Sequence, residues 1–417
     1  MIFEAEDQVQ RLKWAFSSCK NGTWGAEPDA ETDVVCIRAA DFNGRLGRLN
    51  DGERTLRSVE PEALDKLALR SGDIVLEKSG GGEKQLVGRA VIFDGDELSV
   101  TSNFLARCRP SAEVEPAFVN YLLLAIYNSR GTFPHLKQST GIQNLDLASF
   151  LNIRVRIPPL ETQRRIAEFL DKNTARIDGL IGKKRALLKR LAEKRQALIT
   201  RAVTKGLDPA APMKPSGIDW LGDIPAHWEV KRLSSFCEFQ SGKAHEPFIE
   251  PDGQFVCVNA RFISTNGATQ KRCVENLTPA RLGDILMVMS DLPNGRALAR
   301  TFLVDDRDQY AVNQRVCRIR PQEGLAAYFG YQLNRNPQLL KHNDGKEQTH
   351  LSNSNFKLVQ LLYPPQVEQR SIVDHLDHVD SLINETASKV DASVNHLDEY
   401  RAALITAAVT GKISGLQ

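Results

Sequence analysis

The chain has 417 residues, of which 41% are hydrophobic and 25% are charged, as in an ordinary globular protein with two or three domains. A net charge of only +2 gives no sign of nucleic-acid binding through bulk charge. The seven cysteines form no Cys-x-x-Cys pair, which argues against a zinc site and favours reduced thiols in a cytoplasmic protein. The longest apolar run, residues 121–127, is too short to span a membrane.

Residues 1–157 are predicted to form the first domain. Short β-like runs at residues 34–37, 73–76 and 89–93 alternate with turns rich in glycine and aspartate. A helix-like stretch follows at residues 116–128. This alternation is typical of a mixed α/β domain.

Residues 158–206 are predicted to form one long helix. Pro158-Pro159 ends the preceding strand, no proline follows before Pro209, and Gly206 is well placed to end the helix. Some forty helical residues span about 60 Å, much more than an ordinary globular helix.

A second domain and a second long helix complete the chain. Residues 207–216 form a linker rich in proline and alanine, and residues 217–363 form the second domain. That domain begins with the strap 217–236, whose two tryptophans predict an ordered segment. Residues 107–110 of the first domain, Arg-Cys-Arg-Pro, are echoed as Arg-Ile-Arg-Pro from position 318, so one domain shell is predicted to occur twice.

The helical segment is itself repeated. Residues 158–206 align without a gap with residues 364–412, inside the C-terminal segment 364–417. Both copies have apolar residues at a seven-residue spacing, which predicts a seam between the two helices. The predicted seam residues are Ile166, Leu170, Ile177, Leu187, Leu191, Leu198, Ile372, Leu376, Ile383, Val390, Leu397 and Leu404.

The charges of the two helices are complementary. Residues 161–205 hold thirteen Lys or Arg and five Asp or Glu, whereas residues 366–412 hold four and eight. The order domain, helix, domain, helix allows the helices to run antiparallel and the domains to be related by a pseudo-two-fold axis. Duplex DNA is the common ligand with that symmetry, and about 60 Å corresponds to at most roughly 18 base pairs.

Three motifs carry a family resemblance. Each domain leads into Pro-Pro-x-x-x-Gln-Arg-x-Ile-x-x-x-Leu-Asp, each helix closes with Ala-Leu-Ile-Thr-x-Ala-Val-Thr, and the strap reads Gly-Ile-Asp-Trp-Leu-Gly-x-Ile-Pro-x-His-Trp. In these motifs and in its domain order the chain resembles the specificity subunit of Type I restriction–modification systems. One departure is that the strap precedes only the second domain, so the symmetry is incomplete at the N-terminus.

The resemblance implies a fold and a function. The fold is a pseudo-two-fold tandem repeat of α/β (α+β) recognition domains, separated by two long antiparallel coiled-coil-like helices. Such a subunit is not an enzyme: each domain reads one half of a bipartite sequence in double-stranded DNA, and the helices space the domains and bind two methyltransferase subunits. Those partners use S-adenosylmethionine to methylate adenine, and restriction subunits that use ATP and Mg²⁺ join the assembly.

No catalytic motif contradicts this expectation. The sequence has no Asn-Pro-Pro-aromatic motif of an adenine methyltransferase, no Gly-x-x-x-x-Gly-Lys-[Ser/Thr] phosphate loop and no His-Glu-x-x-His motif. His375 and His378, three residues apart, are more typical of a solvated helix face than of a metal site. No cofactor is therefore expected in this chain.

Base reading needs amides, Arg and Lys on loops that reach a groove. The best loops are residues 78–85, where glycines allow close backbone approach, and residues 290–296 in the second domain. The candidate DNA-binding residues of the first domain are Arg38, Lys78, Ser79, Gly80, Gly81, Lys84, Gln85, Asn103, Lys137, Gln143 and Asn144. Those of the second domain are Arg261, Ser290, Asn294, Arg296, Asn313, Gln314, Lys346 and Gln348.

Two alternatives from other classes stay open at this point. The first is a helical scaffold with two protein-binding domains and no nucleic acid. The second is a stand-alone nuclease or methyltransferase, against which the missing motifs argue.

Overall fold

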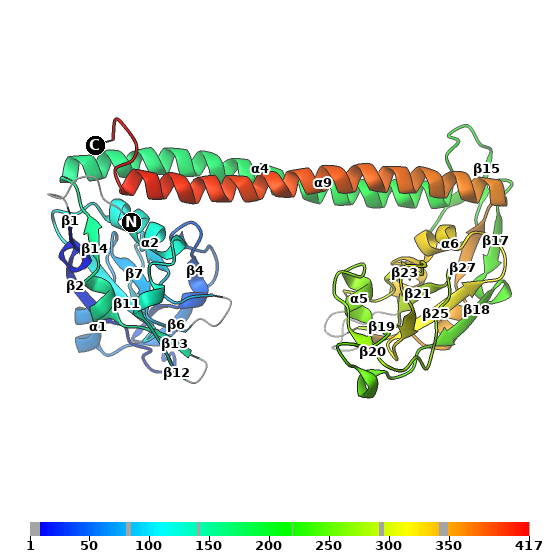
Figure 1. The fold of residues 1–417 in the computed structure, drawn as a ribbon, viewed down its shortest axis with the longest axis horizontal. Helices are drawn as coiled ribbons and strands as arrows, with labels where there is room; N and C mark the ends of the chain where they lie inside the picture. Colours follow the sequence, from blue (N-terminus) through cyan, green and yellow to red (C-terminus); the bar gives the residue numbers. More distant parts are fainter. Residues whose placement is uncertain are drawn as a thin grey trace. The chain divides into compact units, whose positions relative to one another are not determined.

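The computed structural model describes residues 9–80, 85–139, 142–218, 220–291, 296–341 and 349–416. The chain divides into two compact units, each of which is described by itself. The first unit is Met1–Arg185 with Val390–Gln417, and the second is Ala186–Lys389. Each unit therefore holds one mixed α/β domain with part of each long helix (Figure 1).

The first domain is built on two small sheets. The larger is antiparallel, in the order β2-β11-β7-β9: β2 (Phe16–Asn21), β11 (Leu105–Pro110), β7 (Ile74–Glu77) and β9 (Ala90–Ile92). The second has the order β10-β3-β6, with a parallel first pair and an antiparallel second pair: β10 (Ser99–Thr101), β3 (Asp33–Ile37) and β6 (Thr55–Ser58).

Short ladders and helices complete the first domain. Its ladders are β1 (Val9–Arg11) with β14 (Arg154–Arg156), β4 (Phe42–Asn43) with β5 (Arg48–Leu49), and the trio β12 (Leu136–Ser139), β13 (Ile142–Leu145) and β8 (Ser79–Gly80). Its helices are η2 (Leu12–Ala15), η3 (Ala39–Asp41), α1 (Pro61–Leu67), α2 (Pro116–Asn128), η4 (Phe133–His135) and α3 (Leu147–Leu151).

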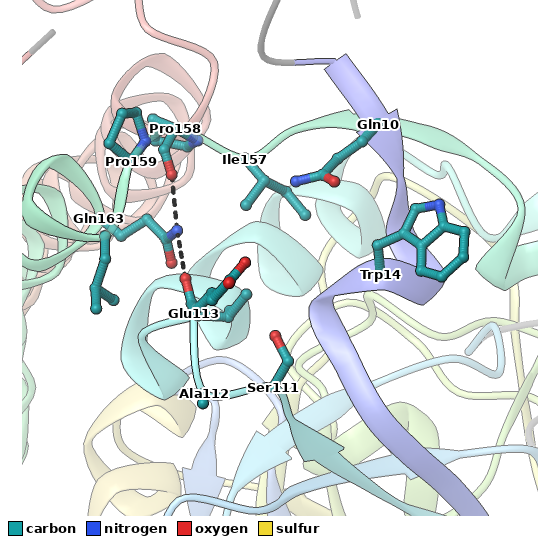
Figure 2. Close-up of a pocket in the computed structure, with 11 residues that line it drawn as sticks. Gln10, Trp14, Ser111, Ala112, Glu113, Ile157, Pro158, Pro159 and Gln163 are labelled. Carbon is teal, nitrogen blue, oxygen red and sulfur yellow. Dashed lines mark hydrogen bonds between the residues drawn. The ribbon is translucent and has the colours of Figure 1, made fainter.

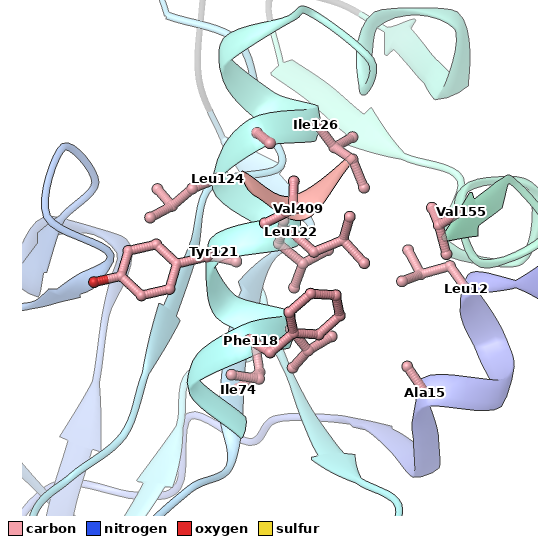
Figure 3. Packing of buried hydrophobic residues seen from close by; sticks show 14 of the residues in the cluster. Leu12, Ala15, Ile74, Phe118, Tyr121, Leu122, Leu124, Ile126, Val155 and Val409 are labelled. Atoms are coloured by element: carbon pink, nitrogen blue, oxygen red, sulfur yellow. The ribbon is translucent and has the colours of Figure 1, made fainter. Parts of the chain in front are cut away.

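Helix α2 lies at the centre of the first core (Figure 3). Pro116 is a favoured first helical residue, and every residue from 118 to 126 is buried. A helix that is buried on all sides packs against a sheet on one side and other helices on the other. Phe118 and Leu122 accordingly share one core with Ile74 of β7 and with Val409 near the end of the second long helix.

The second domain repeats this topology with its own strands. Its antiparallel sheet has the order β18-β25-β21-β23: β18 (Cys237–Ser241), β25 (Val316–Pro321), β21 (Ile285–Val288) and β23 (Thr301–Leu303). Its mixed sheet has the order β20-β19-β24: β20 (Arg272–Cys273), β19 (Phe255–Val258) and β24 (Tyr310–Val312). As in the first domain, one pair of the mixed sheet is parallel and the other antiparallel.

The smaller elements of the second unit correspond only in part to those of the first. Its ladders are β17 (Glu229–Arg232) with β27 (Gln360–Tyr363), β22 (Ser290–Asp291) with β26 (Thr349–His350), and β15 (Met213–Pro215) with β16 (Asp223–Pro225). Its helices are η5 (Leu233–Ser235), η6 (Glu246–Phe248), α5 (Ala260–Ser264), α6 (Ala326–Leu333), α7 (Pro337–Leu340) and α8 (Asn353–Lys357). The predicted recurrence of one domain shell is thus confirmed.

The long helices are α4 (Leu160–Lys205) and α9 (Gln366–Val409). Within the first unit, Ile166 near the start of α4 shares a core with Ile405 near the end of α9. Further along α4, Ile177 and Ile181 pack against Val394, which lies earlier in α9. The helices therefore run antiparallel in this unit, as predicted. Among the helices of the described residues, none is long and apolar enough to cross a membrane.

Most of the predicted seam is at least partly covered. Of its twelve residues, Leu187 is the exposed one, with 43% of its surface accessible. Ile181 and Val394 are buried although they lie outside the predicted columns. Each is four residues beyond a seam position, because an α-helix of 3.6 residues per turn drifts from a strict seven-residue repeat.

A buried arginine links the two helices of the first unit. Arg401 of α9 is only 4% exposed, and its Nε atom lies 3.1 Å from Oδ1 of Asp178 on α4. Burial lowers the pKa of this guanidinium, and Asp178 opposes that shift. Arg401 also donates to the carbonyl of Arg45, whose own guanidinium forms ion pairs with Asp178 and Asp398. These contacts attach a loop of the first domain to both helices.

The Pro-Pro-x-x-x-Gln motif forms a polar bracket at the start of each long helix. The buried Gln163 side chain donates to the carbonyls of Pro158, at 2.7 Å, and Glu113, at 3.2 Å (Figure 2). It also accepts the N–H of Glu115, which precedes α2. Gln369 does the same in the second unit, donating to Pro364 and accepting the N–H of Leu325, which precedes α6.

The described part of the strap packs within the second unit. Ile224 and Trp228 are fully buried in the core that includes Ile199 of α4 and Ile372 of α9. His227 lies 2.8 Å from Glu368 in the first turn of α9. In the first unit, Ile413 and Leu416, which follow α9, pack against the core instead.

Replacing Gln163 with Ala should lower the free energy of unfolding by about 2 kcal/mol, because buried backbone groups lose their partners. Urea unfolding of the full chain measures the change. Gln196→Ala, at an exposed α4 position whose side chain donates a hydrogen bond to Thr200 of the same helix, is the matched control and should alter stability by less than about 0.5 kcal/mol. Equal effects of the two substitutions on the free energy of unfolding would contradict a stabilising role for the Gln163 hydrogen bonds.

Candidate nucleic-acid interface

The first predicted loop continues directly from the central sheet. After β7, Ser79 and Gly80 form β8, which pairs with Asn144 and Gln143 of β13. The Ser79 hydroxyl lies 2.7 Å from Oδ1 of Asn144. The structure thus brings together candidates that are more than sixty positions apart in the sequence. Gly81 and Lys84 lie outside the described residues.

The remaining candidates on this side differ in exposure. Lys137 of β12 is 76% exposed and pairs with Asp146 at 2.7 Å, and this hydrogen bond is the first cause of the lowered pKa of Asp146. Gln143 is only 7% exposed and accepts the N–H of Val87. The Gln143 side chain therefore supports the domain interior, whereas that of Lys137 faces solvent.

Two cations lie at the root of the loop. Arg89 donates from Nε and Nη2 to the nearly buried Glu77, at 2.9 and 3.0 Å, and these bonds raise its pKa. Gln85 lies beside the same guanidinium in the lining of one surface cavity. Burial lowers the pKa of Lys78, so its ammonium group lacks part of its hydration. A phosphate oxygen would compensate that loss.

The second predicted loop begins at the equivalent place in the other domain, after β21. Ser290 is 2% exposed and pairs with His350 across β22 and β26, as Ser79 pairs with Asn144. Arg296 is exposed. Asn294, Lys346 and Gln348 lie outside the described residues.

Asn313 is part of the domain interior. Only 5% exposed, it accepts the N–H groups of His245 and Gln314 and donates to Glu246 at 2.9 Å. The hydrogen bond from Asn313 is the first cause of the lowered pKa of Glu246. The neighbouring Gln314 is exposed. Asn313 therefore positions the turn, and Gln314 is available at the surface.

The other candidates lie at the ends of short elements. Arg38 precedes η3, donates its backbone N–H to Asp41 at 2.7 Å, and leaves its side chain 40% exposed. Arg261 is exposed on α5, and Asn103 is exposed in the turn between β10 and β11. Of these three, Asn103 lies beside the β8 segment, because both Lys78 and Ser79 donate to the carbonyl of the next residue, Phe104.

The β10–β11 turn (residues 102–104) has a counterpart in the β24–β25 turn (residues 313–315). Lys78 donates to the carbonyl of Phe104 at 2.9 Å, and Met289 donates to that of Arg315 at the same distance. The residue after each turn donates back to its first carbonyl, at 3.0 Å in one domain and 2.9 Å in the other. Both domains thus hold this exposed turn against the candidate loop through equivalent backbone bonds.

Three exposed residues and one half-buried residue at this place were not predicted from the sequence. They are Thr23 and Phe104 in the first domain and Lys243 and Arg315 in the second, although Thr23 is partly covered. The repeated Arg-x-Arg-Pro motif could have identified two of them. When Arg107 is aligned with Arg318, Phe104 is aligned with Arg315, three residues earlier.

An ion pair supports the strand next to each turn. Asp73 accepts two bonds from Arg109, both 2.8 Å, and Asp284 accepts two from Arg320, at 2.6 and 2.7 Å. Both carboxylates are nearly inaccessible to water. A charge-assisted pair of this geometry fixes β7 to β11 and β21 to β25.

A groove of about 830 Å³ lies beside the bracket of the first unit (Figure 2). Trp14, which is 62% exposed, and Ile157 line it together with Gln163. In the second unit the residue equivalent to Ile157 is Tyr363, which packs against Phe236 and lies under Lys231. The two junctions therefore share their bracket but differ in their surface.

The side chains that commonly bind metal ions are dispersed in the described part of the chain. There, no group of three or more His, Cys, Asp or Glu side chains could hold a metal ion. His375 and His378 are exposed on α9. All seven cysteines are free, and burial raises the pKa of Cys36 to about 11 and that of Cys257 to about 12.

Comparison with known proteins gives a consistent match. The family model described as "Type I restriction modification DNA specificity domain" matches residues 26–190 and again residues 225–395. The MjaVIII specificity subunit of a Type I restriction enzyme from Methanocaldococcus jannaschii is 25% identical over 307 residues, 70% of each protein. The putative MjaX specificity subunit of the same organism is 22% identical, over 99% of this chain and 93% of that protein.

A solved structure has the same fold. It is described as "Structural basis underlying complex assembly and conformational transition of the type I R-M system". One of its chains aligns with a TM-score of 0.73 and 16% identity, over 97% of this chain and 98% of that one. At this identity the likeness is one of fold.

Replacing Asp284 with Ala should destabilise the second domain by about 3 kcal/mol, because two bonds of Arg320 lose their buried partner. Thermal unfolding followed by circular dichroism measures the loss. Asp306→Ala, at an exposed position of the same domain, serves as the control and should leave the transition nearly unchanged. A transition that does not move in Asp284→Ala would show that the pair lacks this role.

Proposed function

Since the chain belongs to the Type I restriction modification DNA specificity domain family and carries two copies of that domain, we propose that each domain reads one half of a bipartite DNA sequence. The observation that carries this proposal is the duplicated turn. Equivalent backbone bonds hold residues 102–104 and 313–315 in place, and their exposed side chains differ. Unlike side chains on one backbone frame suit two unlike half-sites.

The candidate loops supply two kinds of contact. Lys78 and Lys137 of the first domain, and Arg296 of the second, carry positive charge suited to phosphate oxygens, which set the register on the duplex. The exposed amides of Asn103 and Gln314 suit base edges in the major groove. Buried side chains such as those of Gln143 and Asn313 hold these surfaces in shape.

The long helices are proposed to hold partner subunits at equivalent places. The bracket made by Gln163 recurs at Gln369, so each domain meets its own helix start through the same contacts. Two equivalent junctions suit two copies of one partner. Large apolar side chains on the helices remain exposed and are available to such a partner: Leu180, Leu187, Val367, Leu382 and Tyr400.

In this proposal, the partner subunits carry out the chemical reactions of the assembly. Methyltransferase subunits bind S-adenosylmethionine and methylate adenine, and restriction subunits use ATP and Mg²⁺. This chain contributes no reacting group to either reaction. Its side chains select the DNA sequence at which the partners act.

Modification mapping tests the proposed function. The chain is co-expressed with its cognate methyltransferase subunit, and the host DNA is sequenced for N6-methyladenine. We expect a split, asymmetric motif. Exchanging residues 217–363 for the equivalent domain of a relative should change one half of the motif and leave the other half as it was.

The assembly itself provides the control. Co-purification of this chain with the methyltransferase subunit establishes that the complex has formed before the motif is scored. An assembled complex that methylates no bipartite motif would contradict the proposal and would favour a scaffold of two protein-binding domains.

A further inference from the structure

The two equivalent turns differ at their second and third positions. The β10–β11 turn presents Asn103 and Phe104, and the β24–β25 turn presents Gln314 and Arg315. All four residues are exposed, and Phe104 leaves 47% of its surface accessible although it is fully apolar. Such a side chain on a rigid polar surface is suited to a ligand with apolar groups.

A glycine holds each turn through a backbone hydrogen bond on the side opposite the candidate loop. Gly22 donates its N–H to Leu105 at 3.1 Å, and Gly242 donates to Val316 at 2.9 Å. A Cβ atom at Gly22 would lie 2.1 Å from the carbonyl oxygen of Thr101, and one at Gly242 would lie 2.1 Å from that of Asn313. Because no side chain fits there, only glycine allows these strands to approach the turns so closely.

The carboxamides at the second position of these two turns are not used inside the described structure. Among the described residues, neither the Asn103 nor the Gln314 carboxamide has a hydrogen-bond partner. The positive charge of Arg315 contributes to the lowered pKa of Glu246, behind the hydrogen bond from Asn313, so Arg315 lies within electrostatic reach of that carboxylate. The backbone is fixed on both sides while the polar groups remain available.

We infer that the second and third residues of these turns contact base edges and that their difference helps to make the two half-sites unlike. Gln314 and Arg315 carry an amide and a guanidinium, the groups that pair bidentately with adenine and guanine. Asn103 can pair with adenine, and Phe104 can pack on the methyl group of thymine. This inference rests on the proposed function and names the residues that carry it.

An exchange of the two turns tests the inference in the assembled complex. The double substitution Asn103→Gln with Phe104→Arg gives the first domain the side chains of the second. Methylation of the original motif should fall about tenfold or more, with the change confined to the half-site of the first domain. The reciprocal pair, Gln314→Asn with Arg315→Phe, should affect only the other half-site.

Milder variants and a surface control accompany the exchange. Phe104→Leu and Arg315→Lys keep the size and polarity of the turn, and each should relax discrimination at one base pair in binding assays with singly substituted duplexes. Lys66→Gln on α1, whose exposed ammonium group pairs with Glu62 of the same helix, should leave motif and rate unchanged. The inference would be overturned if both milder variants discriminated at every base as the wild type does and the exchange variants kept the original motif. It would also be overturned if both milder variants behaved as the wild type and the exchange variants lost methylation everywhere.

The outcome also separates this inference from the proposed function. If the wild-type complex yields no bipartite motif, the proposed function fails and the turns lose their role with it. If the wild-type motif is found and both exchanges leave it and its rate intact, only the assignment of these four residues is wrong.

Discussion

The buried glutamine after each Pro-Pro pair is the constraint on which the rest of each unit depends. Its carboxamide joins the end of a domain strand, the start of a long helix and the backbone just before the central domain helix. An amide held by several buried hydrogen bonds tolerates little rotation, since each lost bond leaves a desolvated backbone group. This one side chain therefore helps to fix the direction in which a helix leaves its domain, and the same solution occurs in both units.

That fixed junction allows the domains to share a frame while their surfaces differ. Sheet order, parallel and antiparallel pairs, and the aspartate–arginine pair are the same in both. Variation is found at surface positions, where His350 of the second domain is equivalent to Asn144 of the first, and Arg315 is equivalent to Phe104. Exposed positions can change with little cost in stability, so a duplicated domain can diverge in what it reads.

Much of this fold could be predicted from the sequence, and the candidate site only in part. The gapless repeat, with Pro-Pro before each helix and Gly after it, predicts the long helices, because these start and stop signals are local in the sequence. The exposure of Gln314 and the burial of Gln143 and Asn313 depend on partners far along the chain, such as Val87 and His245. The identity of a residue as Asn or Gln does not show whether its amide holds a loop in place or contacts a base.

The helix seam shows a further limit of periodic patterns, because Arg401 occupies a buried position between hydrophobic contacts. Its counterpart in the repeat, Arg195, pairs with Asp380 at 2.7 Å in the second unit. If one helix slid along the other by seven residues, apolar seam residues would still meet apolar residues. A buried arginine would lose its carboxylate partner, which is present at only one register. In the first unit, the buried pair of Arg401 with Asp178 thus supports the antiparallel register that the leucine and isoleucine contacts alone would leave open.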